Sequence, residues 1–557
     1  MKNGIGRFDR RKFVTGSMSL LAVGSRAAAQ RVPSRQAGTY VDPNFAGDPI
    51  VGPFRPNWES LKAYQCPEWF RDAKFGIWAH WSPQCVPEQG DWYARGMYVQ
   101  GSQQYEYHVK TYGHLSRFGY KDICNLWHAE NWNPEELIRL YAKAGAKYFV
   151  ALGNHHDNFD CWNSKHQPWN AVNVGPKRDI VGTWEKVARA HGLKFGVTFH
   201  GTPGRVWREF MPVRYDSDAT GALKGVSYDG VLTKADGKGK WWDGMDPQQL
   251  NGYPHDKGDP CPDFVDHFML RVQDIIDQYD PDLLYFDDNC DWDFDAGAPS
   301  GKELNVWLGI PELTPPIMAY YYNASIRRNA GKLEGVFNIK NVPKAVWGTL
   351  VRDFEMSQAQ GQQTAPWQTD ACIGGWHYSR WIFENHKYHT PQSMVHLLAD
   401  VVSKNGNLLL NIPLPGHGRP DTDEYAFLND FGEWMRLNGE AIYFTRPWKV
   451  DAEGPTKGAG AKAYGALPTY VPGDIRFTTK GDTLYAIALA WPENGKLVIK
   501  SLSSDSPHYP GKIARVGLLG SESSLQWSRN SDGITVNLPS KQPCNYAYVF
   551  KINSAGV

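Results

Sequence analysis

Between about residues 70 and 415, short apolar runs alternate with amphipathic stretches, and this alternation constrains the fold more than any other feature. The clearest runs are KFGIWAHW, KYFVALGNHH, KFGVTFH and DLLYFDD, at residues 74–81, 147–156, 194–200 and 282–288. Continuous apolar runs are typical of strands covered on both faces, as in parallel sheets. Alternation of strand and helix on this scale predicts a (β/α)8-like barrel.

The segments between these runs carry start and stop signals for helices. Before the second run, Asn133 is placed to cap a helix, with Pro134 at its first position and Glu136 in its first turn. Gly145 ends that helix, and Pro281 ends the helix before the fourth run. We therefore expect helices to connect the strands.

Each of the four runs ends in polar or ionisable residues. The side chains at these ends are His80, His155, His156, His200 and Asp287. In α/β barrels the active site lies at the carboxyl ends of the strands. The sequence therefore predicts that these five side chains share one site.

Two further regions differ from this pattern. Residues 201–262 form a long Gly-, Asp- and Lys-rich insertion, which we expect to overhang the catalytic face. After residues 442–450 the chain reads as short strands separated by turns, which predicts an all-β sandwich. The predicted domains are thus a barrel over 30–448 and a C-terminal β-sandwich over 449–557.

Residues 1–29 have the features of a twin-arginine signal peptide. Arg10 and Arg11 precede an apolar stretch that closes with AAAQ, a cleavage motif ending at Ala29. The alternative is a basic, disordered N-terminus. The first interpretation predicts a periplasmic or secreted protein. No later run approaches ~20 apolar residues, so no membrane insertion is expected.

The charge balance limits the partners. Lys plus Arg and Asp plus Glu both number 59, so no nucleic-acid partner and no polybasic membrane surface are expected. The aromatic content of 13%, with 23 Trp, suits either sugar binding or a Trp-rich core. The eight cysteines form no CxxC pair, which disfavours a zinc knuckle or a thioredoxin motif. No feature favours one oligomeric state.

The histidines allow three interpretations: metal ligands, satisfied core residues, or substrate ligands. Neighbouring side chains on a regular strand point to opposite faces, so His155 and His156 cannot both bind one ion unless the strand end is bent. His80 and His200 could supply further ligands. A metal-dependent hydrolase remains an alternative.

The carboxylates suggest a different chemistry. Glycoside hydrolysis uses two carboxylates. Asp287 follows the apolar run LLYF, so a buried strand would hold its carboxylate rigidly in place. Capping of the next turn by Asp287 or Asp288 is the alternative, and the acidic residues 291–295 are expected to form a solvated loop. Glu355 is the candidate for the second carboxylate. The alternative is that Glu355 is a surface residue without a catalytic role. A retaining pair lies ~5–5.5 Å apart, so a separation far above ~8 Å would exclude Glu355.

Five ordered blocks resemble the α-L-fucosidases of glycoside hydrolase family 29, over about residues 56–500. Two of them are WFRDAKFGIWAHWSPQCVPEQGDWYARGMY and YAKAGAKYFVALGNHHDNFDCWNSKHQPWN. The others are PKRDIVG, VSKNGNLLLNIPLPGHG and GEWMRLNGEAIYFTRPW. Five blocks in the family's order make the resemblance specific.

The resemblance implies roles for individual residues. Asp287 would be the catalytic nucleophile and Glu355 the acid/base, and no cofactor would be needed. The substrate-binding residues would be His80, Trp92, His155 and His156, with Asp91 standing where the family commonly has Glu. His200 is added to the substrate-binding residues because of its position at a strand end. The substrate would be a fucosylated oligosaccharide or glycoconjugate.

Several positions depart from the family's pattern. Asn154 and Asn158 stand where the KHHDGF block has Lys and Gly, and Phe199-His200 replaces a Tyr-Ser pair found in many members. Gln368 stands where a Glu often follows Trp, which removes one rival to Glu355.

The sequence thus predicts a retaining exo-hydrolase of terminal α-L-fucosides. A catalytically lapsed sugar-binding protein is the alternative from another class. The C-terminal module is expected to brace the barrel, with glycan binding as the alternative.

Overall fold

The computed structural model describes residues 44–45, 48–252, 261–289, 313–340, 344–456 and 468–555, which belong to one compact unit. The predicted signal peptide and the acidic residues 291–295 lie outside the described residues. Within the described ranges, no helix combines the length and the apolar character needed to cross a membrane.

Eight parallel strands close into a barrel in the order β10-β3-β4-β5-β6-β7-β8-β9. Their bounds are β3 Phe75–Ala79, β4 Tyr148–Asn154, β5 Lys194–Phe199, β6 Leu283–Asn289, β7 Val336–Lys340, β8 Val351–Glu355, β9 Trp367–Cys372 and β10 Gly406–Asn411. The four predicted strands are β3 to β6. The predicted (β/α)8-like barrel is confirmed.

Burial on both faces explains the apolar runs. All seven residues of β4 are buried, including those that face the barrel interior. The fit is close at Gly76 of β3, because a Cβ atom there would lie 2.3 Å from the ring of Tyr148. Glycine is therefore required at Gly76 by the approach of the neighbouring strand.

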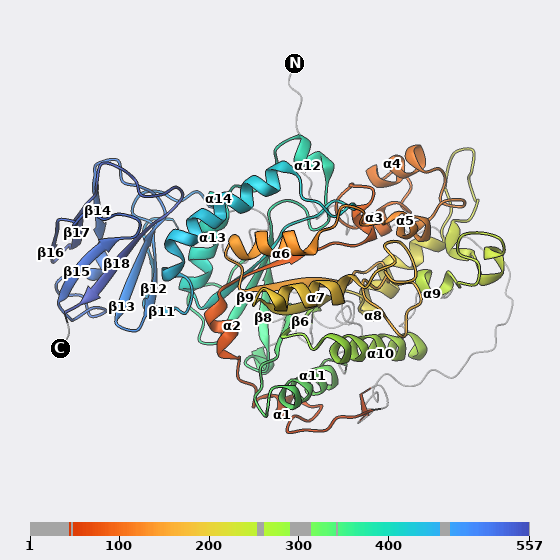
Figure 1. Ribbon diagram of the computed structural model, residues 1–557, viewed down its shortest axis with the longest axis horizontal. Coiled ribbons are helices and arrows are strands. Elements are labelled where there is room, and N and C mark those ends of the chain that lie inside the picture. The colour runs from red at the N-terminus through yellow and green to blue at the C-terminus, as the bar shows by residue number, and fades with distance from the viewer. Residues whose placement is uncertain are drawn as a thin grey trace, which may run out of the picture. The chain divides into compact units, whose positions relative to one another are not determined.

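Helices pack along the outside of the barrel, as Figure 1 shows for α6, α7 and α10. The side chain of Asn133 accepts a hydrogen bond from the Glu136 N–H, which is the predicted cap of α6. The helices between or after barrel strands include α6 Pro134–Lys143, α7 Ile180–Ala190, α10 Pro262–Tyr279, α11 Thr314–Arg328, α12 Arg380–Glu384, α13 Pro391–Ser403 and α14 Thr422–Asn438. Residues 356–366, between β8 and β9, form no helix, so the last barrel units are reduced.

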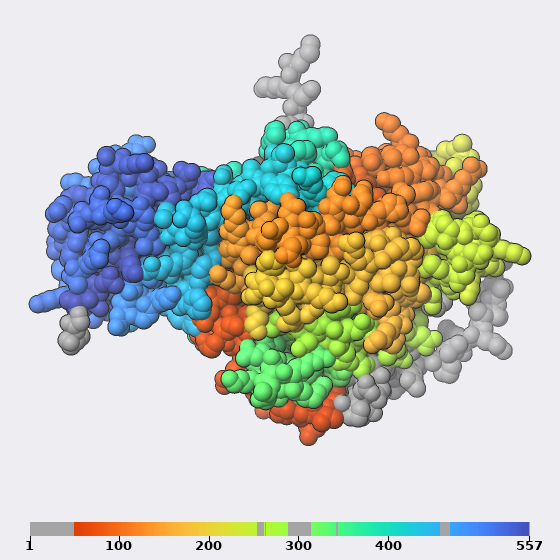
Figure 2. All heavy atoms as spheres, in the orientation of Figure 1, coloured from red at the N-terminus to blue at the C-terminus, as the bar shows by residue number. Residues whose placement is uncertain are grey.

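The segment 201–252 folds as short helical turns against the segment that follows β3 (Figure 2). These turns are α8 Pro203–Arg205, η3 Val206–Phe210, η4 Pro212–Tyr215, η5 Asp229–Val231, η6 Lys234–Gly237 and α9 Gln248–Asn251, and they face α3 Tyr93–Gly96, α4 Gln103–Thr111 and α5 Tyr120–Leu126. Asp229 accepts a hydrogen bond of 2.6 Å from Tyr98 and one of 3.0 Å from Lys121. Residues 201–252 of the insertion therefore pack as part of the barrel domain.

The C-terminal module consists of two antiparallel sheets, ordered β11-β12-β13-β18-β15 and β14-β17-β16. The strands are β11 Arg446–Glu453, β12 Ile475–Lys480, β13 Thr483–Ala488, β14 Lys496–Ile499, β15 Ile513–Leu518, β16 Trp527–Asn530, β17 Gly533–Asn537 and β18 Tyr548–Ser554. Ile475 and Phe550 of one sheet share a hydrophobic core with Leu497 and Ile534 of the other. The boundary predicted between residues 448 and 449 falls within β11.

Buried polar contacts join this module to the barrel helices. Asp400 of α13 pairs with Arg476 of β12, and both side chains are almost fully buried. The indole of Trp434, on α14, donates a hydrogen bond of 2.9 Å to the Ala547 carbonyl. These contacts favour the bracing role.

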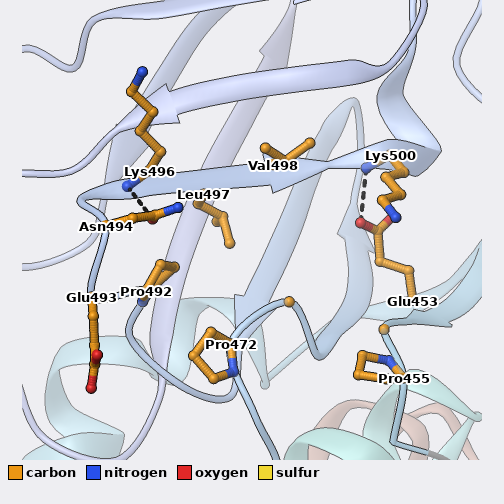
Figure 3. A pocket seen from close by; sticks show the side chains of 12 residues that line it. Glu453, Pro455, Pro472, Pro492, Glu493, Asn494, Lys496, Leu497, Val498 and Lys500 are labelled. Carbon is orange, nitrogen blue, oxygen red and sulfur yellow. Dashed lines mark hydrogen bonds between the residues drawn. The ribbon is translucent and has the colours of Figure 1, made fainter.

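A hollow of about 990 Å³ lies on the module between β14 and the neighbouring loops (Figure 3). Pro455, Pro472 and Pro492 are among the residues that line it, together with Leu497 of β14. None of the twelve residues that line it is aromatic, whereas sugar-binding sites use aromatic faces. The hollow gives no support to glycan binding.

We expect Asp400→Ala to lower the free energy of unfolding by about 3–5 kcal/mol, because it leaves Arg476 buried without its counter-charge. Thermal and urea unfolding followed by circular dichroism measure this. Asp423→Ala removes an exposed partner of His386 and should cost about 1 kcal/mol or less. Equal effects of the two substitutions would contradict the bracing role of the Asp400–Arg476 pair.

Candidate active site

The side chains predicted to share one site do converge at the carboxyl ends of the barrel strands. The ring centroids of His80 and His200 lie 4.7 Å apart, and those of His155 and His200 lie 5.0 Å apart. Asp287, near the end of β6, accepts a hydrogen bond of 3.1 Å from His200 Nδ1. The strand ends therefore form one cluster around Asp287.

His155 and His156 follow the end of β4 and are not part of a regular strand. The register between β4 and β5 shifts between Leu152 and Asn154, where β4 ends. The rings of His155 and His156 consequently lie 4.4 Å apart and do not diverge. Divergence, expected for neighbours on a regular strand, is wrong here because the strand end is bent.

Asp287 is held as a carboxylate by basic groups. Its Oδ1 accepts a hydrogen bond from the Lys340 ammonium, at the end of β7. Burial alone would raise the pKa of Asp287, but Lys340 and then His200 hold that pKa well below its usual range. Asp287 is therefore ionised at neutral pH.

Glu355, the last residue of β8, is hydrogen-bonded to the same Lys340 ammonium as Asp287. Lys340 Nζ donates a hydrogen bond of 3.1 Å to Glu355 Oε2, and the Trp376 indole donates one of 3.2 Å to Oε1. Because both carboxyl groups are bonded to the same nitrogen, the bonded oxygens of Asp287 and Glu355 lie within about 6 Å of each other. The separation suits a retaining pair of carboxylates.

Asp91 and Trp92 line another side of the cluster. His377 Nδ1 donates a hydrogen bond of 2.8 Å to Asp91 Oδ1. The Trp92 ring lies edge-on to His156 at 5.9 Å, and the Arg205 guanidinium lies 5.5 Å from the Trp92 ring centroid. Trp92 thus supplies an apolar wall beside polar groups.

A second acidic pair lies deeper in the barrel. The Tyr285 hydroxyl oxygen lies within hydrogen-bond distance of both, 3.3 Å from Asp353 Oδ2 and 3.2 Å from Asp370 Oδ2. Burial and the neighbouring Asp370 carboxylate raise the pKa of Asp353, so this pair shares a proton. Asp370 lies 3.4 Å from Lys340 Nζ. Burial would lower the pKa of Lys340, but Asp287 and Asp370 raise it, which keeps Lys340 a cation.

The histidines of the cluster are neutral. Burial is the largest cause of the lowered pKa of His80, His155 and His200. Burial and then the Arg205 charge lower the pKa of His156 to about 3. A neutral imidazole offers one N–H donor and one lone pair.

Comparisons with known proteins match this arrangement over most of the chain. The family model "Alpha-L-fucosidase" matches residues 49–440, and the model "Alpha-L-fucosidase C-terminal domain" matches residues 470–553. The chain belongs to the α-L-fucosidase family. The resemblance found in the sequence and the prediction of a glycosidase are thereby confirmed.

Individual members of the family align along most of their length. An α-L-fucosidase of Branchiostoma floridae is 26% identical over 523 residues, which cover 90% of this chain and 95% of the relative. The human tissue α-L-fucosidase is 25% identical and covers 90% of this chain and 91% of its own length. The crystal structure of the Thermotoga maritima α-fucosidase in complex with fucose is 28% identical, has a TM-score of 0.64, and covers 89% of this chain and 99% of its own.

The two departures from the family's KHHDGF block have structural reasons. Asn158 stands at the glycine position with φ of 70°, a conformation that asparagine tolerates better than most residues. Its side-chain oxygen accepts a hydrogen bond of 2.6 Å from Arg271. Asn154, at the lysine position, accepts a hydrogen bond of 2.9 Å from the Gly201 N–H. Both residues stabilise the loop that carries the histidines.

Sequence reasoning missed Gln84, Arg205, Lys340, Trp376 and His377, all of which contact predicted site residues. Lys340 ends the apolar run VFNIK, as Asp287 ends LLYF, so the same strand-end criterion could have found it. Gln84 and Arg205 lie in one-turn helices, and Trp376 and His377 lie in a loop, so no periodic pattern marks these four residues.

The site also has the spacing of a metal centre. One ring nitrogen from each of His80, His155 and His200 lies within 4.8 Å of the other two. Spacing alone therefore does not distinguish a metal ion from a sugar hydroxyl, and the placement of the protons on these rings has to be considered.

We expect Lys340→Met to move the titration of Asp287 to higher pH. Lys340 depresses the pKa of Asp287, so without the ammonium the effect of burial raises that pKa. Carbon-13 NMR of labelled aspartate carboxyl groups measures the titration, with Asp287→Asn for assignment. Lys332→Met, at an exposed lysine before β7, is the matched control. An unchanged Asp287 titration in Lys340→Met would contradict the electrostatic role of Lys340.

Proposed function

We propose that this protein is a retaining exo-α-L-fucosidase that removes terminal α-L-fucosyl residues from oligosaccharides or glycoconjugates, with Asp287 as nucleophile and Glu355 as acid/base. The observation that carries the proposal is the pair of carboxylates bonded to the single Lys340 ammonium. The α-L-fucosidase relatives, including one solved with fucose, support the choice of sugar.

In the first step, Asp287 attacks the anomeric carbon from the β face and the bond to the leaving oxygen breaks. Glu355 transfers its proton to that oxygen, so the aglycone leaves as an alcohol. The product is a β-fucosyl ester of Asp287 and an ionised Glu355.

In the second step, Glu355 takes a proton from a water molecule, which attacks the same carbon from the α face. The ester bond breaks, Asp287 regains its charge, and α-L-fucose leaves. Two inversions retain the configuration.

The remaining side chains of the site orient the substrate. Fucose has ring hydroxyl groups and a methyl group at C5. The neutral histidines offer donors and acceptors to the hydroxyl groups, and Asp91 a further acceptor. The Trp92 ring suits an apolar face of the sugar.

We also propose that residues 1–29 direct twin-arginine export, which would place the mature enzyme in the periplasm or outside the cell. The Arg10-Arg11 pair, the short apolar stretch and the AAAQ motif support this proposal.

Hydrolysis of an aryl α-L-fucoside, compared with α1,2-, α1,3-, α1,4- and α1,6-fucosylated oligosaccharides, tests the activity. We expect Asp287→Ala to lower kcat by roughly 10⁴-fold or more while L-fucose still binds. Azide should restore turnover and give β-L-fucosyl azide, because it attacks from the face that Asp287 occupied. Asp263→Ala, at an exposed aspartate, should change neither value. Unimpaired hydrolysis by Asp287→Ala would exclude the proposed nucleophile.

The acid/base role of Glu355 predicts a dependence on the leaving group. In Glu355→Ala, kcat/KM for a fucosylated oligosaccharide should fall by about 10²–10⁴-fold, because a sugar alkoxide needs a proton to leave. A dinitrophenyl fucoside, whose leaving group needs no proton, should lose far less in its first step, measured as the burst of dinitrophenol. Glu106→Ala is the surface control. Equal losses for both substrates would contradict the assignment.

A further inference from the structure

Gln84, in the turn after β3, has an amide of fixed orientation. The turn is η2 Pro83–Cys85, and the Gln84 side chain within it is fully buried. Gln84 Oε1 accepts a hydrogen bond of 3.0 Å from the Ala94 N–H. Since a main-chain N–H can only donate, the oxygen faces Ala94 and the NH2 group faces the other way.

The NH2 group of Gln84 lies 2.8 Å from His155 Nδ1. An amide NH2 group can only donate, so Nδ1 must present its lone pair. His155 is neutral, because burial and then the neighbouring His156 hold its pKa well below the usual value. Its single proton is therefore on Nε2.

His200 has the complementary arrangement. Its Nδ1 donates to the Asp287 carboxylate at 3.1 Å, so its Nε2 carries a lone pair. His200 Nε2 is buried and has no hydrogen-bond partner among the described residues. The rings of His155 and His200 are stacked at 5.0 Å with an interplanar angle of 27°. One ring nitrogen of His155 and one of His200 lie within 4.8 Å of each other, so a donor on one ring and an acceptor on the other can bind the same ligand atom.

We propose that Gln84 is a positioning residue that sets the tautomer of His155 and thereby fits the histidine cluster to a sugar hydroxyl group and not to a metal ion. A hydroxyl oxygen accepts from His155 Nε2–H while its proton is donated to His200 Nε2. A zinc ion would need a lone pair from every ring, and His155 Nε2 has none to give. The identity of the hydroxyl-bearing ligand rests on the proposed fucosidase function; the tautomer does not.

Gln84→Glu reverses the arrangement with almost no change of shape. One carboxylate oxygen still accepts from Ala94, but the other accepts from His155 Nδ1–H, which moves the lone pair to Nε2. A carboxylate paired with the far nitrogen of a histidine is the usual support of a zinc ligand. The substitution should therefore weaken fucose binding and create a zinc site.

Nitrogen-15 NMR of histidine-labelled free enzyme measures the tautomer directly, with His155→Asn for assignment. In the wild-type enzyme we expect His155 Nε2 protonated and Nδ1 unprotonated, and in Gln84→Glu the reverse. By calorimetry, L-fucose should bind Gln84→Glu roughly 5- to 150-fold more weakly, and one Zn²⁺ per chain should bind the variant but not the wild-type enzyme. Gln100→Glu places the same charge on a half-buried glutamine that accepts a hydrogen bond from the Ala219 N–H, and it should change none of these values.

Gln84→Met is a second variant, which tests the proposal even if the buried carboxylate of Gln84→Glu prevents folding. It keeps the length of the side chain but removes the donor, so both His155 tautomers should be populated and no zinc site should appear. A proton on His155 Nδ1 in the wild-type enzyme, or the wild-type tautomer in both variants, would overturn the proposal. If the wild-type enzyme failed to bind fucose or to hydrolyse fucosides, the proposed function would fall, and the NMR result would still decide the role of Gln84.

Discussion

The contact on which the site depends is the Lys340 ammonium placed among three carboxyl groups, those of Asp287, Glu355 and Asp370. A buried cation is costly unless hydrogen-bonded anions surround it, and a buried carboxylate is costly without a cation. Each group therefore requires the others. The strands β6, β7, β8 and β9 each contribute one of these four residues, so closure of the barrel and assembly of the site are one event.

The proposed reaction moves one negative charge across this ammonium. In the proposed first step Asp287 loses its charge as it becomes an ester, and Glu355 gains a charge as it gives its proton to the leaving oxygen. Lys340 bonds both carboxylates and so contacts the charge before and after the transfer. Because the counter-charge is already in place, neither state requires rearrangement of the barrel, which is the condition for electrostatic catalysis at a fixed site.

Sequence patterns predicted the barrel and the convergence of Asp287 with the histidines, because strand ends are marked locally by the change from apolar to polar residues. They did not show which side chains meet, since the partners come from elements far apart in the chain. His377 and Asp91, for example, are separated by 286 positions. In the C-terminal module, no sequence pattern marks β15 and β16, because both carry many exposed residues and have no continuous apolar run.

Neutral histidines are suited to sugar recognition for a reason that follows from the charge cluster. Protonated rings would crowd the nucleophile with cations that offer donors only, whereas a sugar hydroxyl needs both a donor and an acceptor. Burial keeps the rings neutral. The hydrogen-bond partner of the nitrogen that faces away from the sugar then decides which of the two ring nitrogens carries the proton. Asp287 does this for His200, and the His200 carbonyl does it for His156 by accepting from Nδ1–H. His155 has no such acceptor, and Gln84 donates to it instead. Because Gln84 donates this hydrogen bond and does not accept it, the histidines can bind a hydroxyl group, although their spacing would also suit a metal ion.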